Sequence, residues 1–596
     1  MKNPGSSSIL ALFAALLITF QPTSAYSAET TGATKALYVK HCGDCHNEKR
    51  LGTTAPPLIP GYYSRSNRKR IFEVIRDGLP ASQMPAFKGI LSDEEMRAIT
   101  KYIKTPVKKV TWTFNDIRKS RKEFVSTPPS VNMKERDLED LTLVMERGTK
   151  SVVVLDNGNF NILTKFKVGA VHGGPKYSYA LDKIYAVARD GLVTVFDIKT
   201  LSTILQTRVS ISARGIAVSH DDKTIGVANY LPSNVVFFDA QMEPLYEIPL
   251  DDKAGGFYSI KKEKLFVLSF RDKPEIWFID PANGFKIDKH ILPEPFEDFS
   301  ISPFEPRIVG AKRGSGKMYV YDYKQRKIVG TFPAEGLPHV ASATFWKTKN
   351  GTLYSGINHI MKPEMTILNM SELKIAATVP LPGAGFFVRT HANLPDLWVD
   401  TETEKIVLVD KKTFKIVKTL IPRPGRKAMH VEFDKAGNYA LITIPGDNGA
   451  VIIYDTDTIK PVKTMPFSYP VGKYNATNKT YPARTLDETN PPERTEKNLK
   501  AFSSTPIDDS IMDTSSNLGE EVYYDYCMGC HHQTLEAFGP SLRDIARKRT
   551  RSQIQAHILA PKSSAPALGY KNNSMPKIVL SDKKLEAITD YIISYK

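Results

Sequence analysis

The chain of 596 residues has little cysteine, four residues in all, which excludes a disulfide network as the main source of its stability. Long apolar runs are also lacking: the most hydrophobic stretch covers only residues 9–20, whereas a membrane-spanning helix needs about 20 such residues. No five consecutive Lys or Arg residues occur. The sequence therefore predicts an ordered protein that neither spans a membrane nor carries a basic stripe for nucleic acid.

The net charge is +17, from 81 Lys and Arg against 64 Asp and Glu. Two interpretations remain open for this excess. It can form a solvated basic surface, or it can attract an anionic partner such as an acidic redox protein or a membrane surface. Bound cofactors that carry several carboxylates would neutralise part of it.

Residues 1–28 have the pattern of a secretory signal. Lys2 precedes the apolar stretch 9–20, and the small residues Thr23 and Ala25 suit cleavage after it. We therefore expect an exported protein, in a bacterial periplasm.

All four cysteines lie in two C-x-x-C-H motifs, at residues 42–46 and 527–531. In an exported chain this spacing is typical of haem attachment, because two thiols on one helical turn form thioethers with the haem vinyl groups and the next His reaches the iron. The duplication and the export signal argue against a zinc or redox Cys pair. The predicted attachment residues are Cys42, Cys45, Cys527 and Cys530, and the predicted iron ligands are His46 and His531.

The sequence around each motif resembles a small class I cytochrome c. In both places a Met-Pro pair follows the motif and precedes a helical pattern, at Met84 and at Met575. A Met thioether opposite the His leaves no open coordination position and raises the reduction potential, which suits electron transfer. We expect two α-helical cytochrome c domains, at residues 29–106 and 518–596, each with one covalent haem c.

Between these domains, short β-branched and aromatic runs end in Asp or Asn and are followed by a polar turn. The end positions are 41, 42, 41, 42, 47, 41 and 45 residues apart, and a repeat of about 40–45 residues is typical of a β-propeller blade. We therefore expect a mainly β fold with an eight-bladed propeller at residues 135–480, between linkers at 107–134 and 481–517. The end positions are Asp156, Asp197, Asp239, Asp280, Asp322, Asn369, Asp410 and Asp455.

An export signal, a cytochrome c domain and an eight-bladed propeller in this order resemble the cytochrome cd1 family, which comprises nitrite reductases and proteins of haem d1 biosynthesis. Residues 168–172, 386–391 and 471–475 carry the resemblance. It implies that the propeller binds one non-covalent haem d1, or dihydro-haem d1 as a substrate. The matched iron ligand is His172, and the arginines matched to the tetrapyrrole carboxylates are Arg189, Arg214, Arg271 and Arg389.

Three positions distinguish the two activities found in this family. His339 matches one of the two distal histidines of the nitrite reductases, but Glu297 or Asp298 stands where those enzymes have the second. A carboxylate there would repel nitrite and, when ionised, has no proton to donate. His430 is matched instead in the dihydro-haem d1 dehydrogenases, which desaturate a propionate to an acrylate.

We therefore expect dehydrogenation of dihydro-haem d1, with His339 and His430 as base and as orienting group or distal ligand, and with the c haems as electron outlets. An NO-forming nitrite reductase and a non-catalytic haem d1 carrier are the alternatives. The second cytochrome c domain departs from the relatives; it either stores an electron or replaces a diffusing cytochrome, and the direction of electron flow stays open. Expected partners are a tetrapyrrole or other small-molecule substrate, periplasmic electron-transfer proteins and other haem d1 assembly proteins.

Overall fold

The computed structural model describes residues 24–494 and 518–596 apart from short gaps, and the chain divides into two compact units, residues 1–107 and 108–596. Residues 1–23, most of the predicted export signal, lie outside the described part. The gaps are residues 53–54, 56, 61–62, 64–65, 79–83, 85, 108–109, 127–130, 170, 172, 447, 528–530, 532–538, 571–574, 576–577, 579 and 581. For residues 24–31, 44, 45, 521, 524 and 525 only the backbone is described.

The first unit is a small helical domain built from α1 (Ser24–His46), α2 (Arg68–Asp77) and α3 (Asp93–Tyr102). The third helix begins at a capping box, in which the Ser92 hydroxyl accepts from the Glu95 N–H and the Glu95 carboxylate accepts from the Ser92 N–H. The three helices share one apolar core. This arrangement confirms the predicted helical class of the N-terminal domain.

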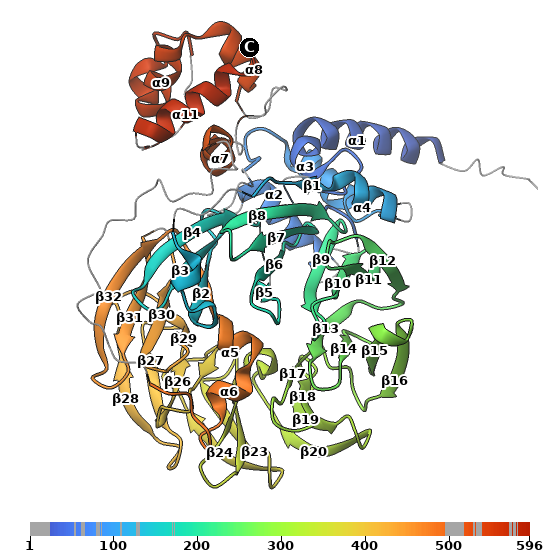
Figure 1. The fold of residues 1–596 in the computed structure, drawn as a ribbon. Helices are drawn as coiled ribbons and strands as arrows, with labels where there is room; N and C mark the ends of the chain where they lie inside the picture. Colours follow the sequence, from blue (N-terminus) through green and yellow to red (C-terminus); the bar gives the residue numbers. More distant parts are fainter. Residues whose placement is uncertain are drawn as a thin grey trace, which may run out of the picture. The chain divides into compact units, whose positions relative to one another are not determined.

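The described strands of the second unit form eight antiparallel sheets, arranged as the blades of a ring (Figure 1). The inner strands of several successive blades contact one another, among them β9 with β13 and β29 with β33, and the ring confirms the predicted eight-bladed propeller. From the inner strand outwards, blades one to four are β33 (Pro470–Asn475), β2 (Leu141–Glu146), β3 (Ser151–Asp156), β4 (Asn161–Lys167); β5 (Lys176–Tyr177), β6 (Lys183–Val187), β7 (Leu192–Asp197), β8 (Ser202–Arg208); β9 (Ser212–Val218), β10 (Thr224–Leu231), β11 (Ser233–Asp239), β12 (Pro244–Pro249); and β13 (Ala254–Ile260), β14 (Leu265–Phe270), β15 (Glu275–Asp280), β16 (Lys286–Ile291).

Blades five to eight follow the same order without a break in the chain. They are β17 (Asp298–Ile301), β18 (Arg307–Ala311), β19 (Lys317–Asp322), β20 (Lys327–Pro333); β21 (Thr344–Lys347), β22 (Leu353–Asn358), β23 (Glu364–Asn369), β24 (Lys374–Pro380); β25 (Val388–Arg389), β26 (Asp396–Asp400), β27 (Ile406–Asp410), β28 (Ile416–Leu420); and β29 (Met429–Phe433), β30 (Tyr439–Ile444), β31 (Gly449–Asp455), β32 (Lys460–Phe467).

The sequence repeat falls on the third strand of every blade. In all eight blades its terminal Asp or Asn side chain accepts a hydrogen bond from a backbone N–H two or three residues later. Such an Asx turn favours the hairpin that leads into the fourth strand. The repeat is therefore a turn signal as much as a strand signal.

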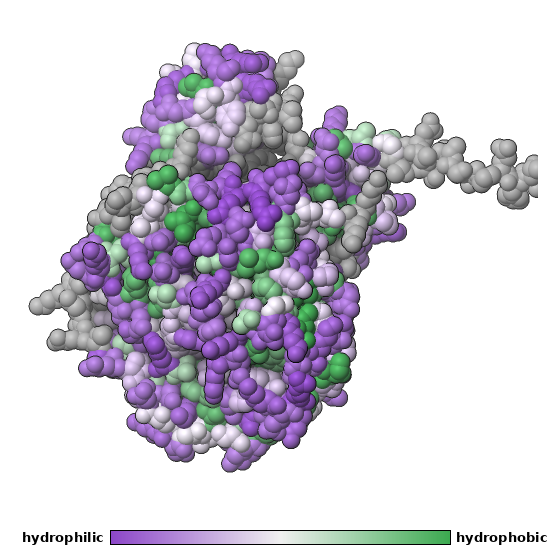
Figure 2. Space-filling model, turned by 45° about the vertical axis from the view of Figure 1, so that its right-hand side comes forward, coloured by the Kyte–Doolittle hydropathy of each residue, from purple (hydrophilic) through white to green (hydrophobic). Residues whose placement is uncertain are grey.

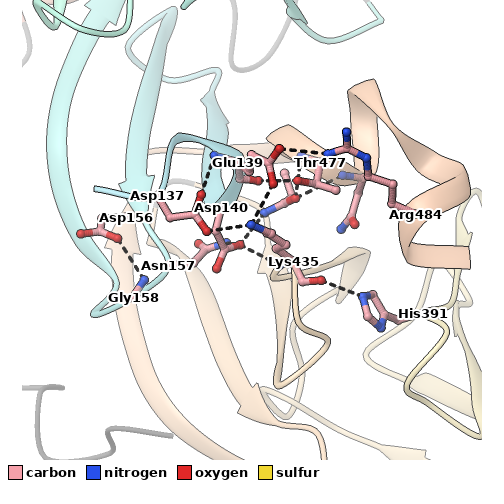
Figure 3. A network of polar contacts seen from close by, with 12 residues as sticks. Asp137, Glu139, Asp140, Asp156, Asn157, Gly158, His391, Lys435, Thr477 and Arg484 are labelled. Atoms are coloured by element: carbon pink, nitrogen blue, oxygen red, sulfur yellow. Dashed lines mark hydrogen bonds and ion pairs between the residues drawn. The ribbon is translucent and has the colours of Figure 1, made fainter. Parts of the chain in front are cut away.

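The ring closes in blade one, where β33 from the end of the propeller pairs with β2 from its start. A polar network reinforces this closure (Figure 3). The Asp140 carboxylate accepts from Lys435 N (2.7 Å), Asn157 Nδ2 (3.0 Å) and Asn475 Nδ2 (2.9 Å), and burial raises the pKa of Asp140 to about 6. Two short helices, α5 (Ala476–Thr480) and α6 (Pro482–Leu486), follow the closing strand.

Part of each predicted linker is folded onto the ring. The helix α4 (Phe114–Ser120) buries Ile117 in the core of blades two and three, and β1 (Lys122–Glu123) adds a fifth strand beside β8. In the second linker, the Arg494 guanidinium donates to the Asp457 carboxylate (2.6 Å). Residues 495–517 lie outside the described part of the chain.

The last described segment is again helical, which confirms the predicted class of the C-terminal domain. Its helices share an apolar core of their own. They are α7 (Leu518–Val522), the π-helix η7 (Tyr523–Cys527), α8 (Leu542–Lys548), α9 (Arg551–Leu559), α10 (Pro561–Ser564) and α11 (Asp582–Ile593).

Hydrophilic residues predominate on the face shown in Figure 2, and hydrophobic residues form small separate groups between them. The most exposed large apolar side chains include Val125, Ile291 and Met361, which are far apart in the sequence. Among the described helices, none combines the length and the apolar character that a membrane crossing requires.

Candidate haem and catalytic sites

The first Cys of each C-x-x-C-H motif is buried, at Cys42 and Cys527. The side chains of the second cysteines, Cys45 and Cys530, lie outside the described part. In both domains a tyrosine eight residues before the motif His donates to the carbonyl of that His: Tyr38 to His46 (3.4 Å) and Tyr523 to His531 (2.8 Å). The two motifs therefore have the same local frame.

The His of the second motif is oriented as a metal ligand. His531 Nδ1–H donates to Pro540 O (2.7 Å), which leaves Nε2 for the iron, and ligating histidines are usually held by such a bond. Burial lowers the pKa of His531 and so favours the neutral, ligating ring. Gly539 is required beside it, because a Cβ there would lie 2.5 Å from the ring.

The predicted sixth ligands lie in the same cores as the motif thiols. Met84 packs against the core that contains Cys42, and Met575 against the core that contains Cys527. Both Met side chains are half-buried. A buried thiol, an oriented His and a Met in one core have the donor set that a haem c requires.

In the ring, the innermost elements of all eight blades carry polar and aromatic side chains that we call the inner-strand cluster. All of its members are buried or half-buried. They are Lys176 (β5), Arg214 (β9), Tyr258 (β13), Asp298 (β17), His339 (before the 3-10 helix η4, Val340–Ser342), Arg389 (β25), His430 (β29), Lys473 and Tyr474 (β33), and Lys479 (α5).

The predicted iron ligand of the propeller, His172, lies outside the described residues. Its neighbours are described. Val171 pairs with Ala188 of blade two, and a Cβ on Gly173, which has φ +80, would meet no atom within 4 Å. The backbone at Gly173 is therefore uncrowded.

His339 presents a hydrogen-bond acceptor to the cluster. Its Nδ1–H donates to Phe386 O (2.8 Å), and the Ser342 hydroxyl lies 2.8 Å from the same nitrogen. Because this network assigns the proton to Nδ1, the neutral ring has its lone pair on Nε2. Burial lowers the pKa of His339, so the ring is neutral and Nε2 accepts at neutral pH.

His430 has the opposite polarity. The backbone N–H of Lys473 donates to His430 Nδ1 (3.3 Å), which assigns the proton to Nε2. Nε2 is buried and has no hydrogen-bond partner among the described residues. The rings of Phe387 (4.4 Å between centroids) and Tyr474 (5.4 Å) flank the imidazole, and burial lowers the pKa of His430 well below its usual value. His430 is therefore a neutral donor.

Two lysines of the cluster lie against each other. Lys176 and Lys479 share a side-chain hydrogen bond. Burial lowers the pKa of Lys176 to about 8, and the adjacent charge of Lys176 lowers the pKa of Lys479 well below its usual value. A carboxylate beside both amines would raise both pKa values.

Two more cations frame the histidines. Lys473 is fully buried; its Nζ donates to His430 O and to the Thr443 hydroxyl, and burial lowers its pKa to about 7. The Arg389 guanidinium donates to Ser342 O (3.0 Å), beside His339. Basic side chains therefore lie beside both imidazoles, Arg389 near His339 and Lys473 near His430.

Asp298 is the carboxylate that the structure brings into this group. It accepts from the Tyr258 hydroxyl (3.2 Å) and pairs with Arg214 (3.7 Å). Glu297, the alternative that the sequence left open, pairs instead with the exposed Arg313 (3.5 Å).

Of the four predicted arginines, two belong to the inner-strand cluster and two do not. Arg214 and Arg389 belong to the cluster, whereas Arg271 stacks on the Tyr230 ring (5.3 Å). Arg189 has an exposed side chain, and its carbonyl accepts from Ala213 N (3.1 Å). The structure brings two of the four together with the histidines.

Sequence reasoning missed the three lysines and Tyr474. Lys473 and Tyr474 lie within residues 471–475, one of the stretches that carried the family resemblance, and Lys176 follows another. Asking which polar side chains lie in or beside these stretches would have found them. Tyr258 of the cluster was missed as well, and it lies far from these stretches. Lys479 has no such signal, because its place depends on the helix after the closing strand.

Known families match the three parts of the chain. Residues 136–479 match the family described as "Cytochrome D1 heme domain". Residues 29–103 match "Cytochrome C oxidase, cbb3-type, subunit III", and residues 516–596 match "Cytochrome c".

Two curated relatives and one solved structure each cover about three quarters of the chain. The chain is 34% identical over 462 residues to "Dihydro-heme d1 dehydrogenase" of Pseudomonas aeruginosa, an alignment that covers 75% of this chain and 94% of the relative. It is 23% identical over 532 residues to "Nitrite reductase" of Stutzerimonas stutzeri, covering 76% and 93%. The solved structure "Dihydro-heme d1 dehydrogenase NirN in complex with DHE" superposes with a TM-score of 0.69 at 32% identity, over 75% of this chain and 99% of that one.

Proposed function

Because the chain belongs to the Cytochrome D1 heme domain family, we propose that it is a haem-dependent oxidoreductase that converts dihydro-haem d1 into haem d1. The reaction turns a propionate side chain, –CH2–CH2–COO⁻, into an acrylate, –CH=CH–COO⁻, and releases two protons and two electrons. The observation that carries the proposal is the pair His339 and His430, two neutral imidazoles that carry their protons on different ring nitrogens, in one cluster rich in basic side chains.

The two histidines have different roles in the proposed reaction. His339 is the base, because its Nε2 lone pair is free at neutral pH and can take a proton from the propionate carbon. His430 is the orienting group, since its Nε2–H can donate to the carboxylate of the same side chain. Burial keeps both rings neutral, so neither role requires a proton to be removed first.

The cations of the cluster recognise the tetrapyrrole. We propose that Arg214, Arg389 and the three lysines bind its carboxylates, since a guanidinium can pair with a carboxylate through two parallel bonds. His172 is proposed as the ligand of the substrate iron. Arg271 and Arg189 are weaker contributors, because their side chains lie outside the cluster.

Haem c, when bound, would supply the outlet for the two electrons. We infer that each helical domain carries one haem c, bound through Cys42 and Cys45 or through Cys527 and Cys530. His46 with Met84, and His531 with Met575, would hold the two irons. A bound haem c accepts one electron at a time, so the two together match the two electrons of one desaturation. The bond from His531 Nδ1 to Pro540 O supports this assignment.

Nitrite reduction to NO is the second candidate, favoured by the match to "Nitrite reductase" over 93% of that relative and by His339. Asp298 argues against it. Its carboxylate accepts from Tyr258 and pairs with Arg214, and a carboxylate at this position would repel nitrite.

One anaerobic experiment separates the candidates. The purified protein with oxidised c haems is mixed with dihydro-haem d1 and a one-electron acceptor, and we expect the absorption spectrum of haem d1 to appear. NO formation from nitrite by the reduced protein would instead establish the reductase. Tight binding of haem d1 without either turnover would establish a carrier.

We further propose that the protein is periplasmic, on the strength of the predicted signal at residues 1–28 and of the two C-x-x-C-H motifs. Its partners would then be periplasmic electron-transfer proteins, which receive the electrons, and the proteins that supply dihydro-haem d1 or take up haem d1.

A further inference from the structure

One buried carboxylate contacts the backbone at both sides of the proposed site. Asp400, the last residue of β26, is fully buried. Its Oδ1 accepts from Phe386 N (2.7 Å) and Phe387 N (3.0 Å), and its Oδ2 accepts from His430 N (3.0 Å). The backbone N–H of Asp400 in turn donates to Phe387 O (3.1 Å). Both carboxylate oxygens are therefore in use at the same time.

Phe386 extends this connection to the other histidine. Its amide is held by Asp400, and its carbonyl accepts the Nδ1–H of His339. The next ring, Phe387, then lies between the two imidazoles, 4.4 Å from His430 and 5.7 Å from His339. The Asp400 carboxylate is therefore connected to both His339 and His430, which are 91 residues apart in the sequence.

The local backbone departs from regular geometry where it meets Asp400. His430 has φ +50, a conformation that non-glycine residues seldom adopt, and the pairing of β29 with β30 shifts register between Met429 and Glu432. Gly385 is required on the other side, because a Cβ there would lie 2.0 Å from Asp400 O. Backbone irregularities held in place by one side chain are typical of functional sites.

We propose that Asp400 is the positioning residue of the site: through three backbone amides it holds His339 Nε2 and His430 Nε2–H in one fixed relative arrangement. Its catalytic meaning rests on the proposed function, whereas the positioning concerns this chain alone. Asparagine has the same shape but only one acceptor oxygen, and its NH2 group would face a backbone N–H. Asp400→Asn must therefore release either the Phe386 and Phe387 amides or the His430 amide.

The test is amide hydrogen exchange on the full-length, haem c-containing protein, combined with steady-state kinetics on dihydro-haem d1. Asp434→Asn is the matched control, because Asp434 is also buried and accepts a backbone bond from Tyr439 N (2.7 Å), within its own turn. In Asp400→Asn we expect the segment around Phe386 or that around His430 to exchange roughly tenfold faster or more. We expect kcat to fall about 10²-fold with KM little changed, as for misplaced catalytic groups. In Asp434→Asn only its own turn should exchange faster, and kcat should stay at the wild-type value.

Unchanged exchange at both segments of Asp400→Asn overturns the proposal, and so does faster exchange with an undiminished kcat. Exchange needs no substrate, so a wild-type protein that fails to convert dihydro-haem d1 contradicts the proposed function and leaves the positioning to be decided by exchange. If Asp400→Asn does not fold, amide exchange in the wild-type protein provides the test. Amides held by one carboxylate should open together, so the amides of Phe386, Phe387 and His430 should exchange within about threefold of one another, and a spread above about tenfold overturns the proposal.

Discussion

At the scale of single residues, the two histidines differ in which ring nitrogen carries the proton, and this difference can be removed selectively. His430→Phe keeps an aromatic ring between Phe387 and Tyr474 but deletes the Nε2–H donor. Loss of an orienting group misplaces the propionate relative to His339, so we expect kcat for dihydro-haem d1 to fall about 10²-fold.

A second buried histidine provides the control for this prediction. His391 Nδ1 accepts from Asn393 N (3.2 Å) and its Nε2–H donates to Lys435 O (3.1 Å), so both ring nitrogens serve the fold. His391→Gln should lower the thermal midpoint without lowering kcat. A His430→Phe protein with the wild-type kcat would show that His430 takes no part in the reaction.

The paired lysines predict a link between binding and protons. Burial lowers the pKa of Lys176 to about 8, and the charge of Lys176 lowers the pKa of Lys479 further, so at pH 8 the free pair holds fewer than two protons. A carboxylate bound between them raises both pKa values. Binding should therefore take up protons at pH 8 and weaken as the pH rises above that value.

Calorimetry in buffers of different ionisation enthalpy measures this uptake directly. The observed binding enthalpy of haem d1 should vary with the buffer for the wild type and should vary less for Lys479→Met, which removes one of the two amines. A wild-type enthalpy that is the same in every buffer would contradict a carboxylate at this pair.

At the scale of elements, the turn that ends each repeat is the local determinant of a blade. In blade seven the Asp410 carboxylate accepts from Lys412 N (3.1 Å), Thr413 N (2.7 Å) and the Thr413 hydroxyl (2.8 Å). Asp410→Ala should lower the free energy of unfolding by about 1 kcal/mol, the usual contribution of such local bonds. Asp410→Asn should lose less, because an amide oxygen can still accept, as Asn369 does in blade six. Denaturant midpoints compare the two, and equal losses would contradict the Asx-turn explanation.

The same turns explain how much of the fold was predictable. Eight strand ends with one polar residue at a regular spacing predicted eight blades, because strand and Asx turn are both local signals. The folding of α4 and β1 onto blade two was not predictable in this way: Trp112 donates to Arg208 O (2.9 Å), a partner that only the closed ring brings within reach.

The site was predictable only in part, for the same reason. Motifs gave the cysteines and the matched histidines, because those signals lie within a few adjacent residues. Asp400 is one of several aspartates that follow an apolar run, and its sequence context resembles that of Asp410. What distinguishes Asp400 is the pair of amides from Phe386 and Phe387 and the amide of His430, which three-dimensional packing alone brings to it.

At the scale of the whole molecule, the site and the closure of the ring depend on the same strand. The closing strand β33 carries Lys473 and Tyr474, which contact His430, and its last residue, Asn475, donates to the Asp140 carboxylate in the network of Figure 3. His430 therefore acquires its proton polarity only when the ring is closed. The strand β33 therefore closes the ring and also provides two of the residues that contact His430.

The second cytochrome c domain leads to a prediction about electron counting. One desaturation releases two electrons, and each haem c accepts one. Without an external acceptor, the oxidised full-length protein should convert about one dihydro-haem d1 per chain in a single rapid phase, if the second haem stores the second electron. A Cys527→Ala, Cys530→Ala protein lacks the second attachment site and should convert about half as much.

Excess external acceptor provides the control, because it removes the need for storage. Under that condition the double variant should reach the wild-type kcat if the second haem only stores an electron. It should be slower if the second haem is the outlet through which electrons leave the first. Equal amounts of haem d1 from both proteins in the rapid phase, measured by stopped-flow absorbance, would show that electrons from the propeller do not reach the C-terminal domain within one turnover.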